Sequence, residues 1–246
     1  DLSFQGYQKQ KGVFFMSAPS MTQNPPRAKM DTRTMVSIAM LTGIAYIVML
    51  LSKLMPSVMF LDFDFKDVVV CIGGFTFGPF AAAIISILVA FIEMLTISHT
   101  GPIGFIMNVL ATCAFSCTAC FIYKKVHSKK GAVLGLACGV ACLVAVMLLW
   151  NYLITPIYMG MDREEIVVPM LIPVFLPFNL VKGGLNMALI LLLYKPVVTA
   201  LRKARLVPQH ESSAQAQKHR TIGVTIVAVI LLATAVLLGL VLADII

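Results

Sequence analysis

Charged side chains are scarce in this sequence. Only 12% of its 246 residues are Asp, Glu, Lys or Arg, whereas 59% are hydrophobic and the mean hydropathy is +0.93. A soluble globular domain carries roughly 25% charged residues. The scarcity excludes an ordinary soluble fold and predicts an all-α, polytopic membrane protein. The net charge of +8 does not indicate nucleic-acid binding, because the basic residues lie between apolar runs and not along one face.

The sequence also lacks the common motifs of catalytic sites. It contains no GxxxxGK[ST], no HExxH, no GxSxG and no aspartate pair within an apolar run. P-loop ATP hydrolysis is therefore excluded, and we expect a protein that is not an enzyme. One enzymatic alternative stays open, in which Glu93 acts with His99, although His99 lies in a turn beyond the end of its apolar run.

No histidine accompanies the cysteines inside the apolar runs. The six cysteines are Cys71, Cys113, Cys117, Cys120, Cys138 and Cys142. Together with the 15 methionines they leave soft-metal transport, for instance of Cu(I), as an alternative. Small polarizable residues are also ordinary in helix packing, so no metal site is predicted.

Six apolar runs predict membrane-spanning helices. They cover about residues 35–51, 68–77, 80–97, 103–123, 132–156 and 173–194. The second and third form one run of 30 apolar residues, which we divide at Gly78-Pro79 because it is too long for a single crossing. This division also places all three basic clusters, at 27–33, 124–130 and 195–220, on one side of the membrane. The positive-inside rule then predicts a cytoplasmic N-terminus.

The ends of the chain differ from this six-helix region. Residues 1–30 are interpreted as a tail, partly of expression-tag origin, because Phe4-Gln5-Gly6 resembles the remnant of a protease cleavage site. The membrane domain is expected at 31–205, followed by a polar linker at 206–220. Residues 221–246 read as a seventh transmembrane helix.

A lysine inside the sixth apolar run indicates a polar cavity. Asn179, Lys182 and Asn186 lie at i, i+3 and i+7, on one helical face. A charged side chain that faces lipid costs roughly 2.5–3.5 kcal/mol, so this face is expected to line a cavity. A snorkelling lysine is the alternative.

Further polar residues fall in the same half of the membrane as Asn179 and Lys182, the half nearer the side without basic clusters. The predicted topology brings Glu93, Asn108 and Asn151 to that level, next to the loop 53–67. Several amides with one Lys and one Glu favour a neutral ligand rich in hydrogen-bonding groups, and Glu93 and Lys182 are expected to neutralise each other. The alternative is that the asparagines only bond between helices.

Small residues at intervals of four predict close helix packing. Ala39 and Gly43 form such a pair in the first run, and it serves either packing within the chain or a partner protein. Gly131, Gly135 and Gly139 repeat in the same way and predict a close-packed helix face.

Four motifs in the order FLDFDFKD, IGGFTFGP, LLWNYLITPIY and LPFNLVKGG carry a family resemblance. The chain resembles the riboflavin-specific substrate-binding (S) components of energy-coupling factor (ECF) transporters, the RibU type, over about residues 34–205. The resemblance implies a six-helix core in a bacterial plasma membrane, with the seventh helix as an addition. It implies riboflavin as the transported ligand, no cofactor, and partners in a transmembrane coupling protein and two cytoplasmic ATPases.

The resemblance also implies roles for single residues. The first external loop would close over the ligand, a role that falls here on Phe60–Asp67, which includes the candidate site residues Leu61, Asp62 and Asp64. Asn151, Asn179 and Lys182 match the ligand-binding positions, and Ala39 and Gly43 match the patch for the coupling protein. Glu93, Asn108 and Asn186 join the site by topology and helical face. An S component for another vitamin, or for a flavin such as FMN, remains the alternative.

Overall fold

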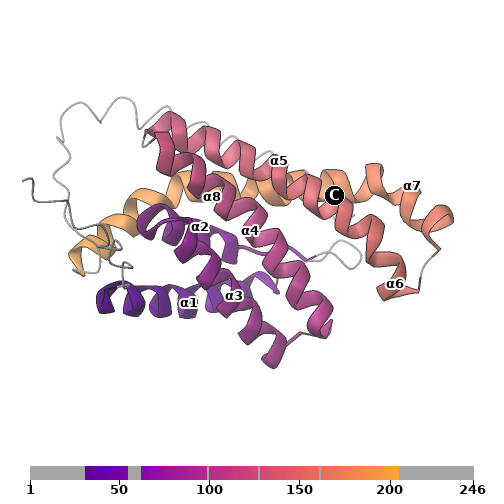
Figure 1. The fold of residues 1–246 in the computed structure, drawn as a ribbon, viewed down its shortest axis with the longest axis horizontal. Helices are drawn as coiled ribbons and strands as arrows, with labels where there is room; N and C mark the ends of the chain where they lie inside the picture. Colours follow the sequence, from indigo (N-terminus) through magenta and orange to yellow (C-terminus); the bar gives the residue numbers. More distant parts are fainter. Residues whose placement is uncertain (1–30, 55–61, 99, 127, 161, 205–246) are drawn as a thin grey trace, which may run out of the picture. The chain divides into compact units, whose positions relative to one another are not determined.

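The computed structural model describes residues 31–54, 62–98, 100–126, 128–160 and 162–204. All regular elements in this part of the chain are helical, which confirms the all-α prediction (Figure 1). The α-helices are α1 (Thr32–Ser52), α2 (Lys66–Phe77), α3 (Pro79–Thr96), α4 (Gly101–Val126), α5 (Lys129–Leu153), α6 (Thr155–Met159), α7 (Val168–Met170) and α8 (Leu176–Lys203). Two π-helical turns, η1 (Arg163–Val167) and η2 (Leu171–Phe175), flank α7.

Five helical segments of the described chain are long and apolar enough to cross a membrane. They are Thr32–Ser52, Pro79–Thr96, Gly101–Val126, Lys130–Leu153 and Val168–Lys203. The helix α2 has only 12 residues and is the short partner of α3 that the sequence predicted. The division at Gly78 is confirmed: its φ of 99° lies in a region that favours glycine, and Pro79 begins α3.

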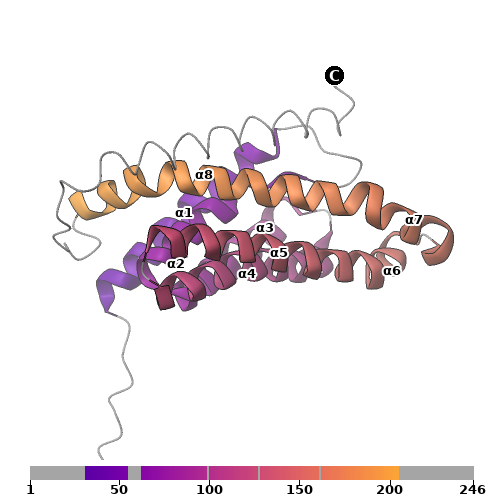
Figure 2. The ribbon, with the colours of Figure 1, turned by 90° about the horizontal axis from the view of Figure 1, so that it is seen from above.

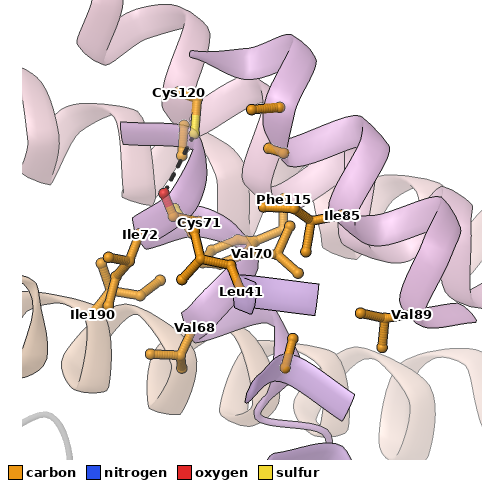
Figure 3. Close-up of a cluster of buried hydrophobic side chains, with 14 of the residues drawn as sticks. Leu41, Val68, Val70, Cys71, Ile72, Ile85, Val89, Phe115, Cys120 and Ile190 are labelled. Carbon is orange, nitrogen blue, oxygen red and sulfur yellow. Dashed lines mark hydrogen bonds between the residues drawn. The ribbon is translucent and has the colours of Figure 1, made fainter. Parts of the chain in front are cut away.

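The short helix α2 lies in the centre of the packing. It contacts α1, α3, α4 and α8. Figure 3 shows its side chains Val68, Val70 and Ile72 among apolar side chains of the neighbouring helices. A helix that is apolar on all sides is stable only when it is buried in this way.

Helix α5, which carries the repeated glycines, packs beside α4, which carries three of the cysteines (Figures 1 and 2). A Cβ atom on Gly135 would lie 2.7 Å from the carbonyl oxygen of Ala119, and one on Gly139 would lie 2.6 Å from that of Phe115. The predicted close-packed glycine face is therefore confirmed at these two positions.

The last predicted run needs correction. We expected the fifth run to end at about residue 156 and the sixth to begin at about residue 173, with a loop between them. The structure instead places α6 and η1 in the loop region and continues in helical conformation from Arg163 to Lys203. Pro173 lies within a π-helical turn and Pro196 within α8. Wider turns and neighbouring helices accommodate the hydrogen bonds that a proline cannot make.

Candidate functional site

A cavity of about 280 Å³ opens among the helices. Its wall comes from α1, residues 62–64, α3, α4, α5, α6 and α8. The charged and amide side chains that line it are Lys53, Asp62, Asp64, Glu93, Asn108, Asn151, Asn179 and Lys182. The cavity is close to the lower end of the roughly 300–1,000 Å³ range of small-molecule sites.

Seven of the predicted site residues line this cavity, namely Asp62, Asp64, Glu93, Asn108, Asn151, Asn179 and Lys182. They come from four helices and the segment before α2, and the structure brings them together around one cavity. Their role in binding a ligand remains a prediction. Leu61 lies outside the described residues, and so does His99 of the enzymatic alternative.

Asn186 does not line the cavity, contrary to our expectation. Its side chain is fully buried, and its amide nitrogen donates hydrogen bonds to the carbonyl oxygen of Asp64 at 3.2 Å and to Oδ2 of Asp67 at 3.4 Å. Asn186 points into the protein, as its i+7 spacing from Asn179 predicted, but the segment before α2 lies between its side chain and the cavity. Asn186 supports the wall from behind.

Glu93 is the centre of the charged part of the wall. Its Oε1 lies 3.3 Å from Nζ of Lys53, and its Oε2 lies 3.3 Å from Nζ of Lys66. The amide nitrogen of Asn108 donates a hydrogen bond of 2.9 Å to the same Oε2. The expected pairing of Glu93 with Lys182 is therefore wrong, because lysines of α2 and of the end of α1 occupy this carboxylate.

The segment 62–65 is held against the helices by several bonds. The amide of Phe65 donates to the hydroxyl of Ser52 on α1 at 3.1 Å. The carboxylate of Asp64 forms an ion pair with Lys66 and also accepts the backbone amide of Lys66 at 3.0 Å. Burial opposes ionisation of Asp64, but Lys66 and Lys182 outweigh it and hold its pKa below the ordinary value. Asp64 therefore presents a carboxylate to the cavity.

The two most buried asparagines of the wall each donate one hydrogen bond to a backbone carbonyl. The amide nitrogen of Asn179 donates to the carbonyl of Phe175 at 2.7 Å, and that of Asn151 donates to the carbonyl of Met147 at 2.8 Å. Oδ1 of Asn151 accepts the hydroxyl of Thr155 at 3.0 Å. A side-chain oxygen keeps a second lone pair after one bond. An amide nitrogen likewise keeps a second hydrogen after one bond, so this part of the wall can both accept hydrogen bonds from a ligand and donate them to it.

Apolar side chains complete the wall. Phe63 and Phe178 lie with their ring centroids 5.1 Å apart, and both line the cavity. Met49, Met107, Met147 and Trp150 also contribute. Flat rings and flexible thioethers form favourable surfaces for a planar aromatic ligand.

Sequence reasoning missed the most deeply buried charges. Lys66 and Asp67 are 0% and 1% exposed, and Asp67 accepts a 2.6 Å hydrogen bond from the hydroxyl of Thr112. Both lie in the stretch 53–67, which the sequence predicts to be a loop. The available signal was their position immediately before a short apolar run, where a charge is expected to be paired.

The described residues contain no group of three His, Cys, Asp or Glu side chains placed to hold a metal ion. The thiol of Cys120 donates to the carbonyl of Cys71 at 3.7 Å (Figure 3), and that of Cys117 donates to the carbonyl of Pro79 at 3.6 Å. These two thiols of α4 therefore contact the backbones of α2 and α3.

Comparison with known proteins gives consistent matches over this region. A family model described as "ECF transporter, substrate-specific component" matches residues 33–197. The chain is 29% identical over 180 residues to the riboflavin transporter RibU of Staphylococcus aureus, covering 70% of this chain and 94% of that protein. It is 29% identical over 189 residues to the riboflavin transporter FmnP of Bacillus subtilis, covering 72% of this chain and 100% of that protein.

A solved structure is similar as well. It is described as "Structure and mechanism of the S component of a bacterial ECF transporter" and matches with a TM-score of 0.58 and 30% sequence identity. The match covers 69% of this chain and 98% of the other. The family match over residues 33–197 includes every residue that lines the cavity.

Proposed function

The chain belongs to the family of substrate-specific components of ECF transporters, and we propose that it is the riboflavin-binding subunit of such a transporter. Two relatives are named riboflavin transporters. The observation that carries the proposal is the cavity in which Asn151, Asn179 and Lys182 meet apolar rings and thioethers. A flavin has the matching chemistry, since it joins a flat aromatic ring to an imide edge and a chain of hydroxyl groups.

The imide edge of the flavin fits the amide part of the wall. Its N–H lies between two carbonyl groups, so it offers a donor flanked by acceptors. The oxygen of Asn179 or of Asn151 can accept this N–H. Each amide nitrogen donates one hydrogen to a backbone carbonyl, and its second hydrogen can donate to a flanking carbonyl of the flavin. Phe63 and Phe178 contact the ring system.

The charged part of the wall fits the hydroxyl chain. Lys182 has no ion pair within 4.0 Å among the described residues, so its ammonium group is available to a ligand oxygen. Asp62 and Asp64 accept hydrogen bonds from hydroxyl groups. No cofactor is required, because riboflavin is the cargo.

Transport requires partners in this proposal. The sequence has no P-loop of its own, so energy must come from a coupling protein and two cytoplasmic ATPases. Ala39 and Gly43 are exposed on α1, and a Cβ on Gly43 would meet nothing within 4 Å. This open surface allows close approach of a partner helix. The protein would lie in a bacterial cell membrane with a cytoplasmic N-terminus, surrounded by lipid.

Quenching of flavin fluorescence tests the proposed site. Purified protein in detergent is titrated with riboflavin, and the variant Asn179→Ala/Lys182→Ala is compared with the wild type. Loss of two polar contacts is expected to weaken binding by roughly 30-fold or more. The matched control is Leu180→Ala, on an exposed position of the same helix, which should keep the wild-type affinity. Unchanged affinity in the double variant would reject this site.

A further inference from the structure

Lys66 is a fully buried lysine that does not line the cavity. Its ammonium group forms an ion pair with Asp64 and lies 3.3 Å from Oε2 of Glu93. Both of these carboxylates do line the cavity. Lys66 therefore lies directly behind the charged part of the wall and acts on the cavity only through its two partners.

The charges of the wall balance only when Lys66 is counted. Two lysines, Lys53 and Lys182, and three carboxylates, Asp62, Asp64 and Glu93, line the cavity. Lys66 supplies the third positive charge. Lys66 is counted because it forms ion pairs with two lining carboxylates. Asp67, the other buried carboxylate among the described residues, is hydrogen-bonded instead to Thr112 and Asn186, neither of which lines the cavity.

A buried carboxylate without a partner is unfavourable, and its charge acts strongly on any ligand nearby. With Lys66 present, the wall offers no excess charge of either sign. Riboflavin is uncharged, whereas its 5′-phosphate ester carries about −1.5 to −2 charges at pH 7. The phosphate group of the ester would lose bound water on entering the cavity, and the lining residues offer it no excess positive charge in exchange.

We propose that Lys66 is a positioning residue that sets the charge selectivity of the cavity, by fixing and neutralising Asp64 and Glu93 without touching the ligand. The proposal rests on the proposed function, because it concerns how the site separates riboflavin from its phosphate ester. Lys66 determines the ratio of the two dissociation constants. It has this effect in addition to any contribution to folding.

The test measures the dissociation constants of riboflavin and of riboflavin 5′-phosphate by fluorescence quenching at pH 7.5. In Lys66→Met the wall gains an unpaired negative charge, so the ratio of the ester constant to the riboflavin constant should rise by on the order of tenfold. In Glu93→Gln the wall loses a negative charge, so the ratio should fall. The double variant Lys66→Met/Glu93→Gln should return close to the wild-type ratio.

Two further variants are controls. Lys66→Arg keeps the charge and should keep the ratio. Lys124→Met removes an exposed lysine from the other end of α4, about 24 Å along the helix from Asn108 at 1.5 Å per residue, and should change nothing. A purely structural role for Lys66 would weaken both ligands in the same proportion, and an unchanged ratio in Lys66→Met would overturn the inference.

Three further outcomes separate a failure of the inference from a failure of the proposed function. If Lys66→Met does not yield folded protein, Glu93→Gln alone tests the charge balance, and an unchanged ratio there overturns the inference. If the wild type binds riboflavin but no variant moves the ratio, the proposed function stands and the inference fails. If the wild type binds neither flavin, the proposed function fails and the inference fails with it.

Discussion

The amide nitrogen of Asn186 on α8 lies 3.2 Å from the carbonyl oxygen of Asp64, which precedes it by 122 positions in the chain. This bond joins the segment before α2 to the helix that carries Asn179 and Lys182. The amide of Phe65 makes the corresponding link to Ser52 on α1. The described part of the connection between α1 and α2, 62–65, is thus a fixed piece of the cavity wall.

Replacing Asn186 should therefore destabilise the protein without removing a ligand contact. In Asn186→Leu the carbonyl of Asp64 loses its buried donor, and the free energy of unfolding should fall by about 1–3 kcal/mol. Thermal unfolding of the ligand-free protein in detergent measures this loss. Leu193→Ala, at an exposed position of the same helix, is the control and should change the midpoint little. A wild-type midpoint for Asn186→Leu would show that the bond contributes nothing.

The contact between α4 and α5 gives a second prediction. In Gly139→Ala the new methyl group would meet the carbonyl oxygen of Phe115 at 2.6 Å, so the two helices must separate. Overpacking of this kind typically costs about 1–3 kcal/mol. The thermal unfolding midpoint should fall. The control is Gly184→Ala on α8, where nothing lies within 4 Å and stability should stay equal or rise. Equal midpoints for both variants would contradict this packing.

The exposed small residues of α1 give a third prediction. Ala39→Leu/Gly43→Leu places bulk on an open surface, so the protein should fold and bind riboflavin as the wild type does. Uptake of riboflavin by cells and co-purification of the coupling protein should both fall, because a partner helix can no longer approach closely. Leu95→Ala, at an exposed position of α3, is the control. Full uptake by the double variant would remove α1 from the partner surface.

The C-terminal part of the sequence gives a fourth prediction. The family match ends at residue 197, and the described helices that build the cavity end at 203. A chain shortened after residue 205 should therefore bind riboflavin with the wild-type affinity. Fluorescence quenching of the shortened protein measures this directly. A large loss of affinity would mean that residues 206–246 belong to the binding domain.

Much of the site could be predicted because helices relate spacing to direction. The three-residue interval between Asn179 and Lys182 predicted their common face. The topology predicted from the lysines between the apolar runs placed Asn108 and Asn151 near this pair, and all four line one cavity. The division between α2 and α3 at Gly78-Pro79 was predicted correctly, because glycine commonly follows the end of a helix and proline favours the first position of the next.

The partners of the buried charges could not be predicted. Lys66 lies at the end of the stretch 53–67, which the sequence predicts to be a loop, and only tertiary packing shows that it meets Glu93, 27 positions away. The helical course of 163–175 was missed for a similar reason. Its prolines act as breakers in isolation, but Val167 and Phe175 are buried against α8 residues such as Phe178. Tertiary contacts outweighed the local preference there.

The central claim is that the cavity between these helices holds riboflavin. Its most direct test is the visible absorption spectrum of purified protein that has been incubated with excess riboflavin and then desalted. The account predicts a flavin spectrum at about one flavin per chain, with the band shape altered by the apolar wall. A protein that is folded, by its thermal unfolding transition, and yet leaves the column without flavin would contradict it.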